Sequence, residues 1–91
     1  MNTSRHFNIK VKGRVQGVGF RNATKSKAMQ LGVTGFVKNQ VDGSVYIEAE
    51  ASDDTLQQFF DWCHYGPSLS KVISVEIEEG KMNNFQNFTT K

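Results

Sequence analysis

The sequence has 91 residues but only one cysteine, one proline and two histidines, and this scarcity excludes several classes of protein. A single cysteine cannot form an internal disulfide, so the chain is not a small disulfide-stabilised domain. Cys63, His6 and His64 form neither a CxxC nor an HExxH pattern, so no metal site is predicted. Residues 1–10 lack the apolar stretch of a signal peptide, and no run approaches the ~20 apolar residues of a membrane span. We therefore expect a cytoplasmic protein with no membrane segment.

An excess of charge of one sign is also missing. Eleven Lys and Arg against nine Asp and Glu give a net charge of +2, which is too weak by itself to indicate a nucleic-acid partner. No linker, internal repeat or low-complexity tract interrupts the chain, and its length fits one domain. We expect a single domain over residues 1–91.

What the sequence does contain is a regular succession of strand and helix patterns. Phe7, Ile9 and Val11 alternate with polar residues, which is typical of a half-buried strand. A helix is predicted over 21–31, ending at Gly32. A second helix is predicted to follow Ser52 as N-cap and to end at Gly66-Pro67. Further strands are predicted at 36–39, 45–51 and 73–77, with Ile73, Val75 and Ile77 on one face, and a short last strand includes Phe88 and Thr90. Asp42-Gly43 predicts a two-residue type I′ turn, in which both central residues have positive φ.

This order of elements predicts the fold. A βαββαβ succession with a short fifth strand indicates an α+β, ferredoxin-like sandwich, in which two helices cover one face of an antiparallel or mixed sheet. The fold alone does not identify an activity, because it hosts many unrelated functions.

The glycine-rich segment from Gly13 to Arg21 is the most informative part of the chain. It leaves a strand and enters a helix, so successive backbone N–H groups can converge on an anion. Arg21 in the first helical turn opposes the helix dipole by about 0.3–1 kcal/mol, unless an anion lies between the guanidinium and the helix end. Neither GxGxxG, which would need glycine in place of Asn22, nor a P-loop fits. On these residues alone, a solvent-exposed arginine beside a tight turn remains the alternative.

Asn39 ends a predicted strand just before the hairpin. Asparagine is depleted in strands, so its side-chain amide is a candidate for holding a water molecule or a substrate oxygen. The simpler interpretation is that the strand has ended and Asn39 opens the turn.

Taken together, three segments resemble the acylphosphatase family: Val15-Gln16-Gly17-Val18-Gly19-Phe20-Arg21, Gly35-Phe36-Val37-Lys38-Asn39 and Asp42-Gly43-Ser44-Val45. The resemblance runs from about residue 7 to residue 75. It implies a cytosolic enzyme that cleaves the carboxyl–phosphate bond of small acyl phosphates, acts as a monomer and uses no cofactor or metal. In that family the loop arginine, here Arg21, binds the phosphoryl group together with loop amides, and the asparagine, here Asn39, orients the attacking water. The resemblance places those amides at Gln16, Gly17, Val18, Gly19, Phe20 and Arg21.

Three positions depart from the family pattern. Phe36 stands where tryptophan or tyrosine is more frequent, and Asn22 follows Arg21 where an aromatic residue is frequent. Gln40 replaces a common threonine after Asn39, and strand alternation predicts that it faces away from Asn39. We expect these changes to tune the site without removing a catalytic group.

Two other functions compete with hydrolysis as interpretations of the sequence. A non-catalytic anion- or RNA-binding module of the same fold would need an RNP1 pattern to bind RNA, and the sequence has none. A domain serving carbamoyl transfer inside a larger enzyme is the third interpretation, and a free-standing chain of this length argues against it provided that the chain is not a fragment. Outside the motifs, we expect His6 to be solvent-exposed, His64 to lie near a helix C-terminus and Cys63 to be a buried small hydrophobe.

Overall fold

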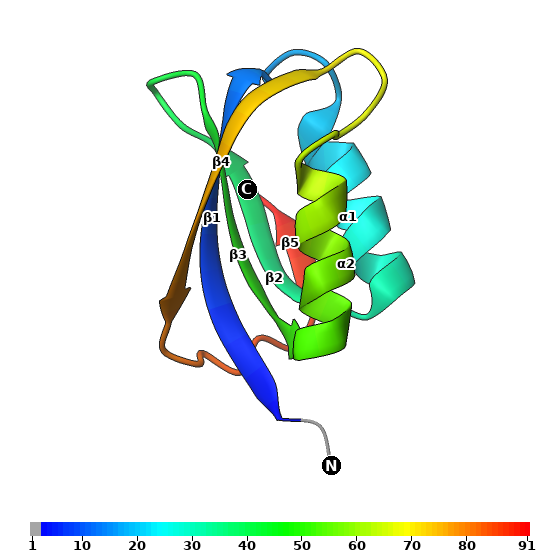
Figure 1. The fold of residues 1–91 in the computed structure, drawn as a ribbon, viewed down its shortest axis with the longest axis vertical. Coiled ribbons are helices and arrows are strands. Elements are labelled where there is room, and N and C mark those ends of the chain that lie inside the picture. The colour runs from blue at the N-terminus through cyan, green and yellow to red at the C-terminus, as the bar shows by residue number, and fades with distance from the viewer. Residues whose placement is uncertain (1–2) are drawn as a thin grey trace.

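A computed structural model describes residues 3–91 and shows one sheet with two helices on one of its faces (Figure 1). The elements are β1 (Ser4–Arg14), α1 (Phe20–Leu31), β2 (Thr34–Asn39), β3 (Val45–Ser52), α2 (Asp53–Cys63), β4 (Lys71–Gly80) and β5 (Phe88–Thr90). The strand order is β4-β1-β3-β2-β5. The β1–β3, β1–β4 and β2–β3 pairs are antiparallel, whereas β2 and β5 are parallel. This confirms the predicted α+β ferredoxin-like fold with a mixed sheet and a short fifth strand.

The core lies between the helices and the central strands. Alternation along β1 turns Ile9 and Val11 toward the helices, and both are fully buried. The buried residues of α1 are Phe20, Thr24 and Ala28, which lie one helical turn apart on the same face. On α2 the buried residues are Leu56, Phe59 and Cys63, which recur at helical spacing. None of the helices within residues 3–91 is long and apolar enough to span a membrane.

The hairpin between β2 and β3 turns where expected, but the prediction of a type I′ turn was wrong. Only Gly43 has positive φ, at 93°, while Asp42 does not. The Gly43 N–H donates to the Gln40 carbonyl over 3.1 Å, so Val41 and Asp42 are the central residues of the turn. The Gln40 N–H donates to the Ser44 carbonyl over 2.9 Å and closes a three-residue loop. A left-handed glycine after the turn is typical of hairpin loops of this length.

The predicted buried face of β4 holds at Val75 but is wrong at Ile73. The pairing with β1 shifts between Lys12 and Gly13, which face Ser74 and Val72 respectively, so Ile73 is left without an opposite residue. Ile73 is 78% exposed as a result. Val72 and Val75 pack against the core instead. An added residue of this kind bends an edge strand and changes where its side chains point.

His6 is not solvent-exposed, contrary to expectation, but buried with 3% of its surface accessible. Residues 81–87, which connect β4 to β5, lie against the sheet on the side away from the helices. The Phe85 ring stacks on the His6 ring, with 6.0 Å between centroids. The buried Glu50 carboxylate accepts hydrogen bonds from His6 Nδ1 (2.7 Å), the Asn83 N–H (2.6 Å) and the Phe85 N–H (3.0 Å). Glu50 therefore anchors this connection to the sheet.

Replacing Glu50 by Gln should destabilise the protein by about 3 kcal/mol, because a neutral amide is left among buried donors that need a carboxylate. Burial raises the pKa of Glu50, but the Asn83 N–H, the His6 ring and the Phe85 N–H outweigh it and hold the pKa below its ordinary value of 4.5. The stability that Glu50 contributes is therefore complete above that value and is lost as the pH falls below it. Urea unfolding between about pH 3 and pH 7 measures both effects.

The exposed Glu78 on β4 provides a charge-matched control for this experiment. Glu78→Gln should keep both the stability and the acid-dependent slope of the original protein. An equally steep loss of stability in acid for Glu50→Gln and the unmodified protein would contradict the assignment.

Candidate functional site

The loop between β1 and α1 has the geometry of an anion-binding loop. Gly17 and Gly19 both adopt left-handed backbone conformations, with φ of 73° and 79°. Left-handed residues in such a loop turn neighbouring N–H groups toward one side. Gly19 is also the N-cap of α1 and has no side chain to accept hydrogen bonds from the first helical N–H groups. Val15 and Phe20, each 1% exposed, hold the two ends of the loop in the core.

The loop, the start of α1 and the end of β2 enclose a cavity of about 110 Å³. Its lining residues are Val15, Gly17, Gly19, Phe20, Arg21, Asn22 and Asn39. The structure thus brings the predicted Gly17, Gly19, Phe20, Arg21 and Asn39 together, while Gln16 and Val18 are not among the lining residues. Val15 was missed, because its apolar side chain in the sequence indicates only core packing. Asn22, noted only as a departure from the family, is part of the rim.

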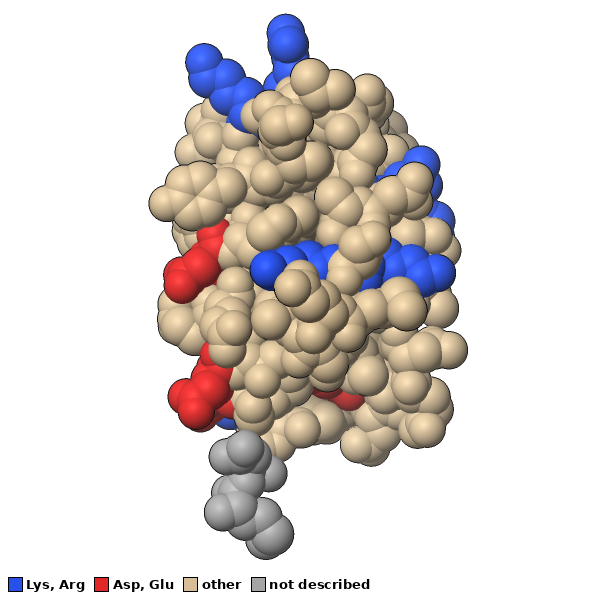
Figure 2. Space-filling view, turned by 90° about the vertical axis from the view of Figure 1, so that its right-hand side faces the viewer, with Lys and Arg blue, Asp and Glu red and all other residues tan. Residues whose placement is uncertain are grey.

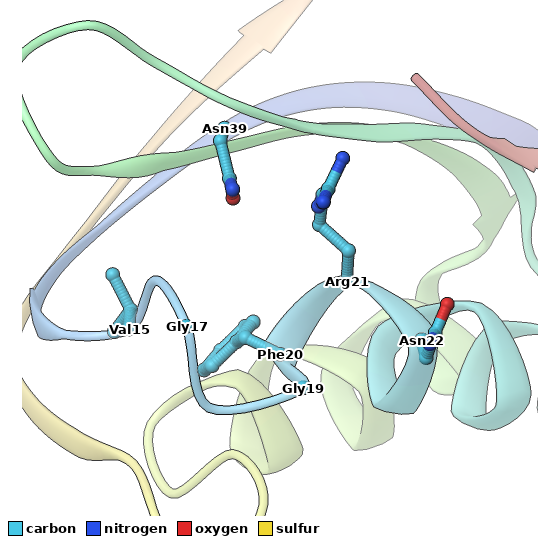
Figure 3. A pocket seen from close by; sticks show the side chains of 7 residues that line it. All are labelled: Val15, Gly17, Gly19, Phe20, Arg21, Asn22 and Asn39. Atoms are coloured by element: carbon cyan, nitrogen blue, oxygen red, sulfur yellow. The ribbon is translucent and has the colours of Figure 1, made fainter.

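Arg21 and Asn39 approach the cavity from opposite sides (Figure 3). Asn39 points from the end of β2 toward the loop, and Arg21 points from the start of α1 toward the sheet. Strand alternation had predicted that Gln40 would face away from Asn39, and its Oε1 accepts a hydrogen bond from the Ser44 hydroxyl over 2.9 Å. Gln40 therefore supports the hairpin rather than the cavity.

The segment after β5 holds the Arg21 side chain. Arg21 Nη1 donates to the backbone oxygen of Lys91 over 3.0 Å. The Lys91 N–H in turn donates to the Val37 carbonyl over 2.8 Å, which continues the pairing with β2. Lys91 Nζ lies 4.0 Å from the centroid of the Phe36 ring, so the phenylalanine that departs from the family pattern keeps a packing role. No sequence pattern pointed to Lys91, because its contribution is a backbone oxygen.

The two helices differ in charge. α1 has basic and no acidic side chains, whereas α2 has acidic and no basic ones. The basic residues of α1 are Arg21, Lys25 and Lys27, and the acidic residues of α2 are Asp53, Asp54 and Asp61. On the face that lies to the right in Figure 1, Lys and Arg form a band across the middle, and Asp and Glu lie mainly toward one margin (Figure 2). An anion is attracted to the α1 side of the molecule.

The remaining candidate ligands and nucleophiles do not gather at the cavity. Within residues 3–91, no group of three or more His, Cys, Asp or Glu side chains is arranged to hold a metal ion. Cys63 is fully buried on α2, as expected, and burial raises the pKa of its thiol. His64 caps the C-terminus of α2, as expected, with Nδ1 2.8 Å from the Phe60 carbonyl oxygen.

Comparison with known proteins gives a consistent result. The acylphosphatase family model matches residues 7–90. The acylphosphatase of Lactiplantibacillus plantarum is 46% identical over 85 residues, which cover 92% of this chain and 94% of that protein. The crystal structure of acylphosphatase from Bacillus subtilis has a TM-score of 0.93 at 34% identity and covers 98% of this chain and 99% of its own.

A structure of HypF from T. kodakarensis is also similar, with a TM-score of 0.85 at 27% identity. This match covers 96% of the present chain but 12% of HypF. The similarity thus extends over nearly all of the first two proteins and over a small part of the third.

Proposed function

We propose, from the premise that this chain belongs to the acylphosphatase family and hydrolyses acyl phosphates, that its β1–α1 loop holds the phosphoryl group. In this proposal Arg21 and the amides of Gln16 to Arg21 bind the phosphoryl oxygens, and Asn39 orients the attacking water. The substrate class is a small acyl phosphate.

The observation that carries the proposal is the start of α1, which is left without any negative charge. Gly19 provides no capping side chain, and the first turn contains Arg21 but no acidic residue. The start of α2 has the opposite composition, since Ser52 precedes it and the acidic Asp53 and Asp54 occupy its first turn. A helix N-terminus carries about half a positive charge. An anion in the cavity would be attracted by both this charge and the guanidinium.

The size of the cavity supports a phosphoryl group as that anion. A volume of about 110 Å³ is several times the ~10–15 Å³ that is needed to hold one water molecule. The cavity therefore has room for a phosphoryl group and an attacking water, while the acyl group would extend into solvent. Recognition of this kind places most of the binding energy on the phosphoryl end of the substrate.

The reaction follows from these parts. The water oxygen forms a bond to phosphorus, the bond between phosphorus and the carboxyl oxygen breaks, and the electron pair leaves with the carboxylate. Such a leaving group needs no general acid, because the pKa of a carboxylic acid is about 4. The proton of the attacking water passes to a phosphoryl oxygen, because none of the described residues that line the cavity is a His, Asp or Glu. Arg21 and the amides stabilise the charge on the equatorial oxygens, which is the main requirement of phosphoryl transfer.

The proposal extends to the form in which the protein acts, a single-domain monomer in the cytoplasm. One continuous core joins both helices to the sheet, which supports a single domain. The single cysteine, which is buried and unpaired, suits a reducing compartment.

Titration with inorganic phosphate, followed by amide NMR, tests the binding site. Phosphate should shift the amide signals of residues 16–21 in a saturable way. The amides of Asp53 and Asp54 at the start of α2 are an internal control and should not respond. In parallel, release of phosphate from an aryl acyl phosphate should proceed unchanged in excess chelator. Saturable shifts confined to another surface, or turnover abolished by the chelator, would contradict the proposed mechanism.

A further inference from the structure

The side chain of Gln16 is not part of the cavity lining and bonds instead to the β2–β3 hairpin. Its Nε2 donates one hydrogen bond to the Gln40 carbonyl and one to the Ser44 carbonyl, both over 2.8 Å. The side chain is half-buried, and both of its amide protons are used. Gln16 therefore joins the β1–α1 loop to the base of the hairpin by two directed bonds.

The hairpin does not depend on this link for its own closure. The Ser44 carbonyl already accepts from the Gln40 N–H, and the Gln40 carbonyl already accepts from the Gly43 N–H. A carbonyl oxygen has two lone pairs, and Gln16 uses the second one of each. Loss of the Gln16 amide would leave both carbonyls with a partner, so it removes the connection between two segments rather than a hairpin bond.

The position of the link gives it a function in the site. Gln16 directly precedes Gly17 of the cavity lining, and Gln40 directly follows Asn39. The link thus connects the phosphoryl-binding loop to the hairpin through two residues that each adjoin a cavity-lining residue in sequence. Reacting atoms must stand about 3–3.5 Å apart, and a misplacement of about 1 Å can cost about 10²-fold in rate.

We propose, on the basis of the proposed function, that Gln16 is a positioning residue that fixes the water-orienting Asn39 relative to the phosphoryl-binding loop. To bond to the Gln40 and Ser44 carbonyls at once, the side chain needs two N–H groups on one nitrogen at the end of a three-atom stem. Glutamate has the length but no donor, methionine has the shape but no donor, and asparagine has the donors but is too short. Gln16 acts through Asn39 and does not touch the substrate with its side chain.

Replacing Gln16 by Met should lower kcat by about 10- to 100-fold, because the two halves of the site lose their alignment. KM and the inhibition constant of inorganic phosphate should change less than about threefold, because Arg21 and the loop amides remain. Gln16→Glu places a carboxylate against two carbonyl oxygens and should lower kcat further. If one of the two Gln16 variants does not fold, the other one still tests the inference. All assays are run well below the measured Tm of each protein.

A matched control is available on the other face of the same hairpin. Lys10 Nζ pairs with Asp42 Oδ2 over 2.8 Å and so also connects β1 to this hairpin. Lys10→Met removes that connection and should leave kcat within about twofold, because it does not involve the loop. An equal loss of kcat in Lys10→Met and Gln16→Met would show general loosening of the hairpin and overturn the inference.

A double-variant cycle gives the decisive result. In an Asn39→Ala background, Gln16→Met should add less than about a twofold loss of kcat, because the group that it positions is gone. The inference would be overturned if the kcat losses of Gln16→Met and Asn39→Ala multiplied in the double variant. It would also be overturned if Gln16→Met kept wild-type kcat, with or without a large rise in the phosphate inhibition constant. Full activity of Asn39→Ala alone would instead contradict the proposed function, so the two failures are distinguishable.

Discussion

Arg21→Ala should lower kcat/KM for an acyl phosphate by about 10³-fold. Removing one preorganised donor to a developing oxyanion typically costs about 10²–10³ in rate, and an arginine at a transferring phosphoryl group about 10³–10⁵. The variant also loses affinity for the product. A hydrogen bond to a charged group contributes about 1.5–3 kcal/mol, so the inhibition constant of inorganic phosphate should rise by about 10- to 100-fold. Steady-state kinetics with phosphate as inhibitor measures both quantities.

Two further variants show which property of Arg21 matters. Arg21→Lys keeps the charge but loses the planar pair of donors, so it should recover only a small part of the rate. Lys27→Ala removes one positive charge from the same helix, where Lys27 Nζ contacts Gln30, and should retain nearly full activity. If Arg21→Ala and Lys27→Ala lost equal amounts of activity, the effect would be one of net charge, and Arg21 would have no specific role.

Asn39→Ala should abolish most turnover while leaving phosphate binding intact. The side chain points into the cavity from β2, opposite Arg21 (Figure 3). In the proposed function, its amide orients the attacking water. Loss of this orientation should lower kcat by about 10²-fold or more. KM and the phosphate inhibition constant should stay within about threefold, because the groups that hold the phosphoryl oxygens are unchanged. Comparing kcat with both constants separates water orientation from substrate binding.

Asn39→Asp provides a nearly isosteric comparison. A carboxylate at this position faces the phosphoryl group with a like charge, so this variant should weaken phosphate binding as well as turnover. Retention of normal kcat in the alanine variant would rule out the role of Asn39. If Asn39→Ala and Asn39→Asp weakened phosphate binding equally, Asn39 would bind the phosphoryl group rather than orient the water.

The order of elements could be predicted from the sequence because each element carries its own local pattern. Ile9 and Val11 alternate, Leu56, Phe59 and Cys63 recur with helical spacing, and both patterns correspond to buried faces. The site could be predicted in outline for a related reason, since its loop and Asn39 lie in two short, recognisable segments. Their approach across the cavity follows from the fold.

The features that could not be predicted depend on contacts between distant segments. His6 is buried because residues 81–87 cross over it, and that segment has no periodic pattern. Ile73 is exposed because pairing with β1 shifts at Lys12 and Gly13, which a single strand cannot reveal. The Lys91 oxygen that holds Arg21 belongs to the backbone, so no residue type could indicate it. Gln16 was expected to contribute its backbone amide, whereas its side-chain bonds depend on the loop geometry of the hairpin.

Cys63 gives the protein a built-in probe of its own dynamics. Its thiol is fully buried beneath α2, and burial raises the pKa of that thiol, so it is unreactive while the helix stays in place. A thiol reagent reaches it only when the packing around the C-terminal end of α2 opens. The rate of labelling therefore reports how often the core opens. Because Cys63 is not among the residues that line the cavity, thiol labelling and substrate turnover are measured at two different places in one small molecule.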